Sequence, residues 1–312
     1  MGTPDPAAMM AAVEQRRSEL LARCPLAPPS LTSEEAAAVP INIIELGTSG
    51  PSVLIVHGGL QGGLGGAPAT FDKQKVLADH GWRLRFVERP GFGQSASRGV
   101  DDMEADAEWI ADMLGNGSHL VGHSWGGAAA LLAAARRPEA VRSLTLIEPA
   151  LFPIVMTDPV LRSDPEMQLV GGRLAQLMLQ SRTPAEYALG FARTVLGSPD
   201  DDGTKALVAK LAGDESTAAS MGCALLHSRM ASPATMRAAA HTVAERSIPV
   251  LVVSGGWSPF FDRIGEVVAS FTGGRFEVVP ASNHMVQYTS ADTFNPLLRS
   301  FLQAADEWGS NS

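Results

Sequence analysis

The sequence predicts an α/β fold with a mostly parallel central sheet, helices on both faces and an inserted helical cap. Short apolar runs alternate with helical segments towards both ends of the chain, which is the pattern of a parallel sheet covered on both faces. The segment 151–246 interrupts this alternation with helical stretches and no convincing strand. Hydrophobic residues make up 45% and charged residues only 18% of the 312 residues, so the composition favours a folded chain with a large core.

The elements follow one another in a regular order. Strands are expected at 41–46, 52–57, 82–88, 119–122, 141–148, 248–254 and 275–280, and core helices at 69–80, 101–115, 125–137, 261–271 and 291–306. The unbroken apolar run 52–57 is typical of a buried parallel strand. We therefore expect a core domain formed by 41–150 and 247–312, a cap at 151–246, and an N-terminal helical extension at 1–40 whose amphipathic helix spans 6–23.

Charge and cysteine content limit the partners and the compartment. The formal net charge of −9 argues against nucleic acid and anionic membranes as partners. Cys24 and Cys223 are far apart in the chain and are expected to be free thiols, and no Cys/His cluster predicts a metal. The start of the chain lacks the pattern of a signal peptide, and no run reaches the roughly 18 apolar residues of a membrane span. A cytoplasmic protein is expected, and the N-terminal helix packs on the domain or on a second subunit of a homodimer.

Ser124 is the predicted nucleophile. It lies in Gly122-His-Ser-Trp-Gly126, between an expected strand and an alanine-rich helix. A sharp turn of this kind needs small flanking residues and exposes the serine Oγ at the carboxyl edge of the sheet. It also places the Trp125 N–H at a helix N-terminus, where it can bind an oxyanion.

The second oxyanion donor is expected in the glycine-rich loop after the strand 52–57. The N–H of Gly59 is the best candidate, because glycine lets the backbone approach the reacting group closely. A phosphate-binding role is disfavoured, since the loop has no Walker lysine and lacks the glycine spacing of a dinucleotide site. His57 is expected to tie the loop by hydrogen bonds. The base is expected to be His284, which alone among the seven histidines follows the last strand.

These motifs resemble the α/β-hydrolase superfamily over about 41–305. The matching pieces are His57-Gly-Gly59, Arg89-Pro-Gly-Phe-Gly-Gln-Ser95, Gly122-His-Ser-Trp-Gly126 and His284, in the order of that family. The resemblance implies the fold and leaves the substrate open, since the fold hosts esterases, lactonases, thioesterases, C–C hydrolases and other enzymes. The serine disfavours dehalogenases and epoxide hydrolases, which resemble this chain but carry aspartate there.

The acid departs from the commonest pattern of the family. Ser258 stands where many members have aspartate, and a serine cannot carry the charge that stabilises an imidazolium. Glu148, at the end of the strand after the nucleophile helix, resembles the acid of some zearalenone-hydrolase-type lactonases and polyketide thioesterases. We prefer Glu148, while Asp262 and the absence of any acid remain alternatives.

The resulting expectation is a serine hydrolase for a medium-sized hydrophobic ester, lactone or thioester, with no metal or organic cofactor. The pocket is expected to include Leu60, Trp257, Met285, Met156 and Tyr187, because apolar, methionine-rich pockets suit such substrates. Two alternatives remain: a thioesterase or cyclase that tailors a secondary metabolite, and a non-catalytic binding protein that has kept the fold.

Overall fold

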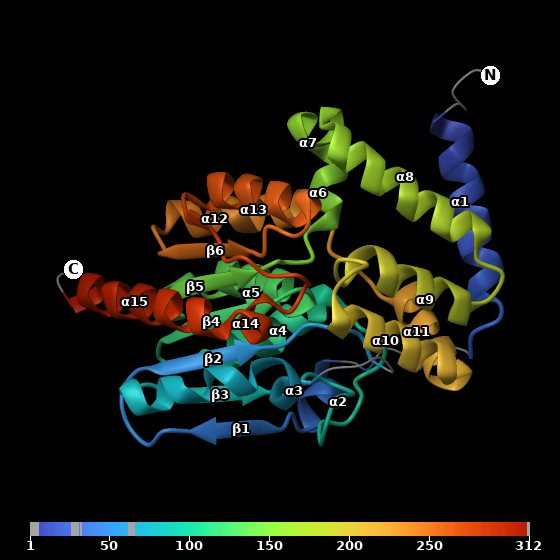
Figure 1. Ribbon diagram of the computed structural model, residues 1–312. Coiled ribbons are helices and arrows are strands. Elements are labelled where there is room, and N and C mark those ends of the chain that lie inside the picture. Colours follow the sequence, from blue (N-terminus) through green and yellow to red (C-terminus); the bar gives the residue numbers. More distant parts are fainter. Residues whose placement is uncertain (1–5, 26–30, 32, 62–65, 311–312) are drawn as a thin grey trace.

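The computed structural model describes residues 6–25, 31, 33–61 and 66–310. Its centre is a seven-stranded sheet in the order β1-β3-β2-β4-β5-β6-β7, in which every pair is parallel except β1 with β3 (Figure 1). The strands are β1 (Ile43–Leu46), β2 (Ser52–Val56), β3 (Arg83–Val87), β4 (Ser118–His123), β5 (Val141–Ile147), β6 (Val250–Ser254) and β7 (Arg275–Val278). The predicted fold class is confirmed, and the observed strands lie within about two residues of the expected ones.

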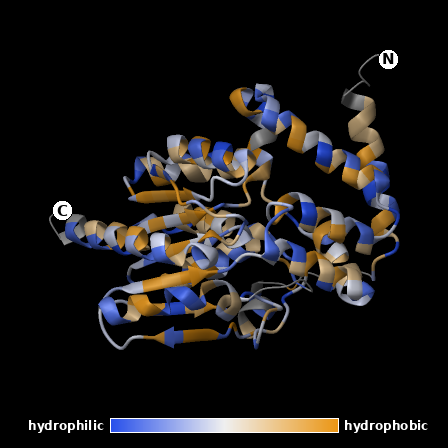
Figure 2. Cartoon of the chain, in the orientation of Figure 1, coloured by the Kyte–Doolittle hydropathy of each residue, from blue (hydrophilic) through white to orange (hydrophobic). Residues whose placement is uncertain are grey.

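Helices cover both faces of the sheet because successive strand residues point to opposite sides. Leu54 and Val252 pack towards α4 (Met103–Met113), α5 (Trp125–Arg136), α12 (Pro233–Glu245) and α13 (Pro259–Thr272). Val53 and Val253 pack towards α3 (Ala67–Phe71), the 3₁₀-helix Asp72–His80, α14 (Val286–Thr289) and α15 (Ala291–Ser310). The strands form the apolar centre of the molecule in Figure 2. The helix expected at 69–80 is thus divided between α3 and the 3₁₀-helix.

The segment between β5 and β6 contains helices and no strand. Its helices are α6 (Phe152–Thr157), α7 (Pro159–Ser163), α8 (Pro165–Gln180), α9 (Pro184–Val195), α10 (Asp202–Gly213), α11 (Glu215–His227) and α12. Figure 1 shows α8–α11 together beyond the arrowhead of β2, whereas α12 packs with α5 and α13 among the helices of the core. The remaining helices of the described chain are α1 (Pro6–Leu21), α2 (Ser33–Ala38) and the 3₁₀-turn Pro138–Ala140. Within the described residues, no helix is long and apolar enough to cross a membrane.

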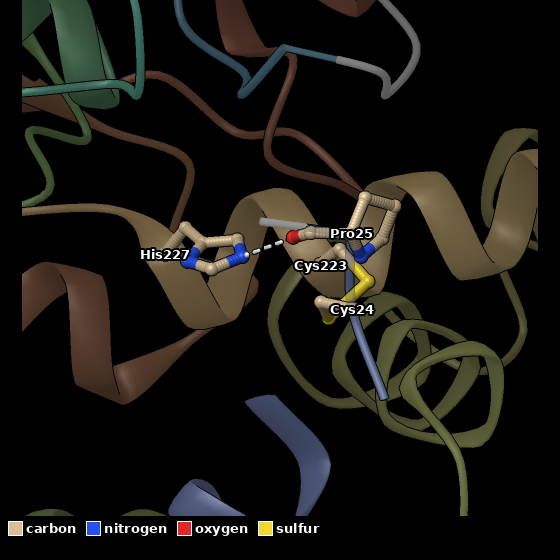
Figure 3. Close-up of a disulfide and its surroundings, with 4 residues drawn as sticks. All are labelled: Cys24, Pro25, Cys223 and His227. Atoms are coloured by element: carbon tan, nitrogen blue, oxygen red, sulfur yellow. Dashed lines mark hydrogen bonds between the residues drawn. A yellow bond between two sulfur atoms is a disulfide. The ribbon is translucent and has the colours of Figure 1, made fainter. Parts of the chain in front are cut away.

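The expectation that both cysteines are free thiols is wrong. Cys24, just after α1, forms a disulfide with Cys223 in α11 (Figure 3). Beside it, His227 makes a 3.2 Å hydrogen bond to the carbonyl of Pro25. The pairing depends on α1 docking against α8 and α11, where Leu20 is completely buried. The positions of the two cysteines in the sequence, 199 residues apart, give no indication that they are in contact.

The disulfide should stabilise the protein measurably. It closes a loop between positions 199 residues apart. Restricting the unfolded chain over such a loop predicts that reduction lowers the free energy of unfolding by about 2–5 kcal/mol. Urea unfolding with and without a phosphine reductant measures this difference. Cys24→Ser should show the same loss without reductant and no further loss with it; equal stability of the oxidised and reduced wild-type protein would contradict the prediction.

Candidate active site

Ser124 occupies a strained turn between β4 and α5. Its backbone has φ 54° and ψ −120°, a conformation that costs a non-glycine residue free energy and that concentrates at functional sites. The flanking glycines are required sterically. A Cβ on Gly122 would lie 2.6 Å from the carbonyl oxygen of Gly126, and one on Gly126 would lie 2.4 Å from that of His57. The turn leaves Ser124 partly exposed next to a buried helix.

The register of the sheet places three strand ends side by side. His123 pairs with Ile147, and Ile147 pairs with Val253. The residues that follow β4 and β5 are therefore neighbours: Ser124 N donates to Ile147 O and Glu148 N donates to Val253 O, both at 2.9 Å. This is why a glutamate one strand over from the nucleophile lies within reach of the same site.

The two predicted oxyanion donors lie on either side of Ser124. Trp125 is the first residue of α5, where backbone N–H groups have no acceptor within the helix. Gly58 contacts the nucleophile so closely that a Cβ there would be 2.6 Å from the Cβ of Ser124. Gly59 follows with φ 86°, a left-handed conformation that favours glycine. The geometry thus brings the Gly58–Gly59 loop and the start of α5 to the same serine.

His284 and Glu148 are hydrogen-bonded to each other. His284 Nδ1 lies 2.6 Å from Glu148 Oε2, and both side chains are buried. The other carboxylate oxygen, Oε1, accepts 2.9 Å hydrogen bonds from Gly255 N and from Trp257 Nε1. These three donors orient the carboxylate, and the carboxylate orients the imidazole so that Nε2 is directed away from it.

Burial acts on both members of this pair. It raises the pKa of Glu148, an effect that the hydrogen bonds from Gly255 and Trp257 oppose because they stabilise the carboxylate. It lowers the pKa of His284 to about 3. The uncharged imidazole, which is the form that can accept a proton, therefore predominates around neutral pH.

The alternative acid, Asp262, is engaged elsewhere. Its Oδ1 accepts hydrogen bonds from Ser254 Oγ at 2.5 Å and from Gly256 N at 3.2 Å, so it braces the loop after β6. Ser258, which stands at the usual position of the acid, is the N-cap residue just before α13, and within the described residues its side chain makes no capping bond. The structure brings Glu148, and not Asp262, to the histidine.

Two aromatic neighbours of the base were not anticipated in these roles. The Phe261 ring stacks on His284 with centroids 4.5 Å apart. His123 makes a 2.7 Å hydrogen bond through Nε2 to the carbonyl of His284, with the two rings 4.6 Å apart. Phe261 could not be found from the sequence, because its contact depends on how α13 is oriented against the loop after β7. His123 is thus bonded to the backbone of the loop that carries the base.

The loop that carries His284 is held by the segment between α9 and α10. His284 N donates to Leu196 O at 3.1 Å, and Ser198 N donates to Ser282 O at 3.0 Å. Asp201 accepts from Ser282 Oγ at 2.5 Å and from Asn283 Nδ2 at 3.0 Å. These and the Thr204 hydrogen bonds outweigh partial burial and lower the pKa of Asp201 to about 2. The helical segment thus contacts the base loop directly.

The predicted pocket residues lie in different surroundings. Trp257 donates to Glu148, Leu60 packs against the core beside it, and Met285 directly follows the base. Tyr187 instead packs with Leu20, Met178 and Leu226 against α1, so the structure does not bring it to the base. The Met156 side chain lies outside the described residues. No group of three or more His, Cys, Asp or Glu in the described part of the chain could hold a metal ion.

His57 and His123 make the protein sensitive to acid. Burial, reinforced by Arg89, lowers the pKa of His57 to about 3, and burial with the nearby His284 lowers that of His123 well below its ordinary value. His57 donates through Nδ1 to Gly58 O and accepts through Nε2 from Arg89 N, so a second proton would break a hydrogen bond. Among the residues that the structure describes, the buried Nδ1 of His123 has no hydrogen-bond partner.

Below pH 6.5 the unfolded histidines bind protons that the folded ones do not, so stability falls as pH falls. Between about pH 7 and pH 5.5 each is expected to cost about 1.3 kcal/mol, or about 2.5 kcal/mol together. Urea unfolding at both values measures the loss. His57→Gln should reduce the loss by about 1.3 kcal/mol, its own share, and the exposed His241 provides the control substitution. A pH dependence that is the same in His57→Gln and in the wild type would refute this account.

Comparison with known proteins decides the family. A family model described as the alpha/beta hydrolase fold matches residues 51–291. The chain belongs to the α/β-hydrolase family. The matched region of this α/β-hydrolase includes Ser124, Glu148 and His284, and the fold and family predicted from the motifs are confirmed.

Named relatives of this α/β-hydrolase are hydrolases. It is 28% identical over 255 residues to a pimeloyl-[acyl-carrier protein] methyl ester esterase of Neisseria meningitidis serogroup A, covering 80% of this chain and 76% of the relative. It is 24% identical over 292 residues to a 2-hydroxy-6-oxononadienedioate/2-hydroxy-6-oxononatrienedioate hydrolase of Burkholderia vietnamiensis, covering 86% and 93%. An esterase structure from Exiguobacterium antarcticum matches with a TM-score of 0.59 and 20% identity, covering 84% of this chain and 95% of that one, which supports the fold.

Proposed function

We propose that this α/β-hydrolase is a serine hydrolase that cleaves a carboxylic ester or lactone of a medium-sized hydrophobic substrate through an acyl-enzyme on Ser124. The observation that carries the proposal is the buried 2.6 Å hydrogen bond between His284 and Glu148 at the sheet edge that also holds the strained serine. A base oriented by a carboxylate, at the same sheet edge as a partly exposed serine, is the constellation of acyl transfer. The esterase relatives support the same reaction class.

The reaction would proceed in two halves. Ser124 Oγ attacks the acyl carbon while His284 Nε2 takes its proton, and Glu148 stabilises the resulting imidazolium. The N–H groups of Gly59 and Trp125 bind the oxyanion, each worth about 2.7–4 kcal/mol in the transition state. The protonated base then gives its proton to the leaving alcohol. Water, deprotonated by the same base, releases the acid and restores the serine.

The surroundings of the triad favour an apolar acyl group. The rings of Trp257 and Phe261 lie 5.8 Å apart between centroids, and those of Phe152 and Phe260 lie 5.3 Å apart, so aromatic rings gather where α6 and α13 meet. Met285 lies next to the base. Hydrophobic and aromatic linings with few polar groups are typical of sites for apolar ligands.

A fluorophosphonate probe and an ester series test the proposal. We expect the probe to label Ser124 rapidly, and His284→Ala to abolish labelling, because the serine needs its base. We expect turnover of p-nitrophenyl and methyl esters of intermediate chain length and of aliphatic lactones. Absence of labelling in the wild-type protein would overturn the proposal in favour of a binding protein. Labelling with turnover of thioesters alone would favour a thioesterase instead.

A further inference from the structure

A fully buried arginine lies behind the glycine loop. Arg89 Nη2 donates to Asp101 Oδ1 at 2.6 Å and to Asp106 Oδ2 at 2.8 Å, and Nε approaches the same Asp106 oxygen at 3.2 Å. Burial opposes the charge of Arg89, but Asp106 and Asp101 outweigh it and raise its pKa. These three side chains, which we call the Arg89 cluster, form an ion network with little access to solvent.

On one side the Arg89 cluster holds the glycine loop. Arg89 Nη1 donates to Gly59 O at 2.7 Å, and Asp101 Oδ2 accepts from Gln61 N at 2.8 Å. Consecutive glycines lose much conformational freedom when they are fixed, so this loop depends on external contacts for its shape. The two hydrogen bonds hold the backbone on the carboxyl side of the Gly59 N–H.

On its other side the Arg89 cluster holds the start of α5. Asp106 Oδ2 accepts from Trp125 Nε1 at 2.8 Å, and the Arg89 guanidinium lies 5.6 Å from the Trp125 ring. The second Asp106 oxygen accepts from Trp109 Nε1 at 2.9 Å, which fixes the carboxylate itself. One ion network therefore touches both residues that carry the predicted oxyanion donors.

Stability alone does not account for this arrangement. Buried ion networks are often no more stabilising than apolar residues of similar volume. Electrostatic catalysis, in contrast, requires donors that are fixed before charge develops. We propose, on the basis of the function proposed above, that Arg89 with Asp101 and Asp106 is a positioning device that sets the Gly59 and Trp125 N–H groups at the oxyanion.

Arg89→Met and Arg85→Met form a matched pair for the test. Arg85 lies on β3, four residues before Arg89, is mostly buried and donates to a backbone carbonyl, that of Met113, at 2.7 Å. Arg89→Met should lower kcat for p-nitrophenyl butyrate by about 10–100-fold with KM within about twofold. Its inhibition constant for an alkyl trifluoromethyl ketone, to which Ser124 Oγ adds to form an oxyanion, should rise by a similar factor. Arg85→Met should change the melting temperature and leave both quantities near the wild-type values.

Trp125→Phe provides a milder test that keeps an aromatic ring and the backbone N–H but removes the indole N–H that donates to Asp106. It should lower kcat several-fold and weaken the ketone in parallel. If kcat and ketone affinity in both variants match those of Arg85→Met, the Arg89 cluster is only structural and the inference is wrong. If the wild-type protein is neither labelled by fluorophosphonate nor active on esters, the proposed function itself fails and the inference falls with it. The two failures are therefore distinguishable.

Discussion

Replacing Ser124 with alanine is expected to lower kcat for p-nitrophenyl esters by about 10⁶-fold, the loss typical of removing the nucleophile from a serine–histidine–acid site. Alanine keeps the Cβ and removes only Oγ, so the acyl-enzyme can no longer form. Any residual rate would come from the oxyanion donors and from substrate binding. The measurement is steady-state kinetics on purified protein, with circular dichroism to show that the fold is retained.

Ser258→Ala is the matched control for that prediction. Ser258 is also near the site, but its side chain makes no capping bond. It should hydrolyse the same esters at nearly the wild-type rate. A Ser124→Ala protein that keeps a substantial part of the wild-type activity would show that another group is the nucleophile.

The nucleophile and the base could be predicted because their signals are local. Ser124 lies in a strand–turn–helix segment whose glycines are required by close backbone contacts at Gly122 and Gly126. His284 was identified by its order after the last strand. Predicting Glu148 required one further inference, that the end of β5 lies beside the end of β4 in a parallel sheet. The strand register shows this adjacency directly.

The features that escaped prediction depend on how whole elements dock. Cys24 meets Cys223 only because α1 packs against α11. Tyr187 lies on a helix that the sequence predicts, but its side chain faces α1, and periodicity does not identify the neighbour of each face. Phe261 is stacked on the base by the orientation of α13. Such contacts are set by packing between segments distant in sequence.

The Arg89 cluster combines a local sequence signal with contacts that depend on the fold. Arg89 belongs to the motif Arg89-Pro-Gly-Phe-Gly-Gln-Ser95, which in the sequence indicates only the fold. Its partners Asp101 and Asp106 follow in the next loop and helix. Their convergence on Gly59 and Trp125 links the turn after β3 to the chemistry at Ser124. A motif that identifies the fold can thus also contain a residue that positions the groups of the active site.

Glu148→Gln is expected to lower kcat by about 10³–10⁴-fold, because the acid of such a site holds the correct tautomer of the base and stabilises the imidazolium. The carboxylate accepts from three N–H donors: His284 Nδ1, Gly255 N and Trp257 Nε1. A glutamine has one oxygen and one NH₂ group. Whichever way its amide is turned, the NH₂ faces either the histidine or the loop donors, and a hydrogen bond is lost.

Asp262→Asn is the comparison that decides the acid. Asparagine can still accept from Ser254 Oγ, so the loop after β6 should persist and kcat should stay near the wild-type value. The opposite result, with kcat nearly unchanged in Glu148→Gln and strongly lowered in Asp262→Asn, would identify Asp262 in α13 as the acid. If neither substitution lowered kcat, Ser124 and His284 would act without an acid. The burial of Glu148 and its direct bond to the imidazole argue for the first outcome, because an uncompensated imidazolium at this depth would be costly.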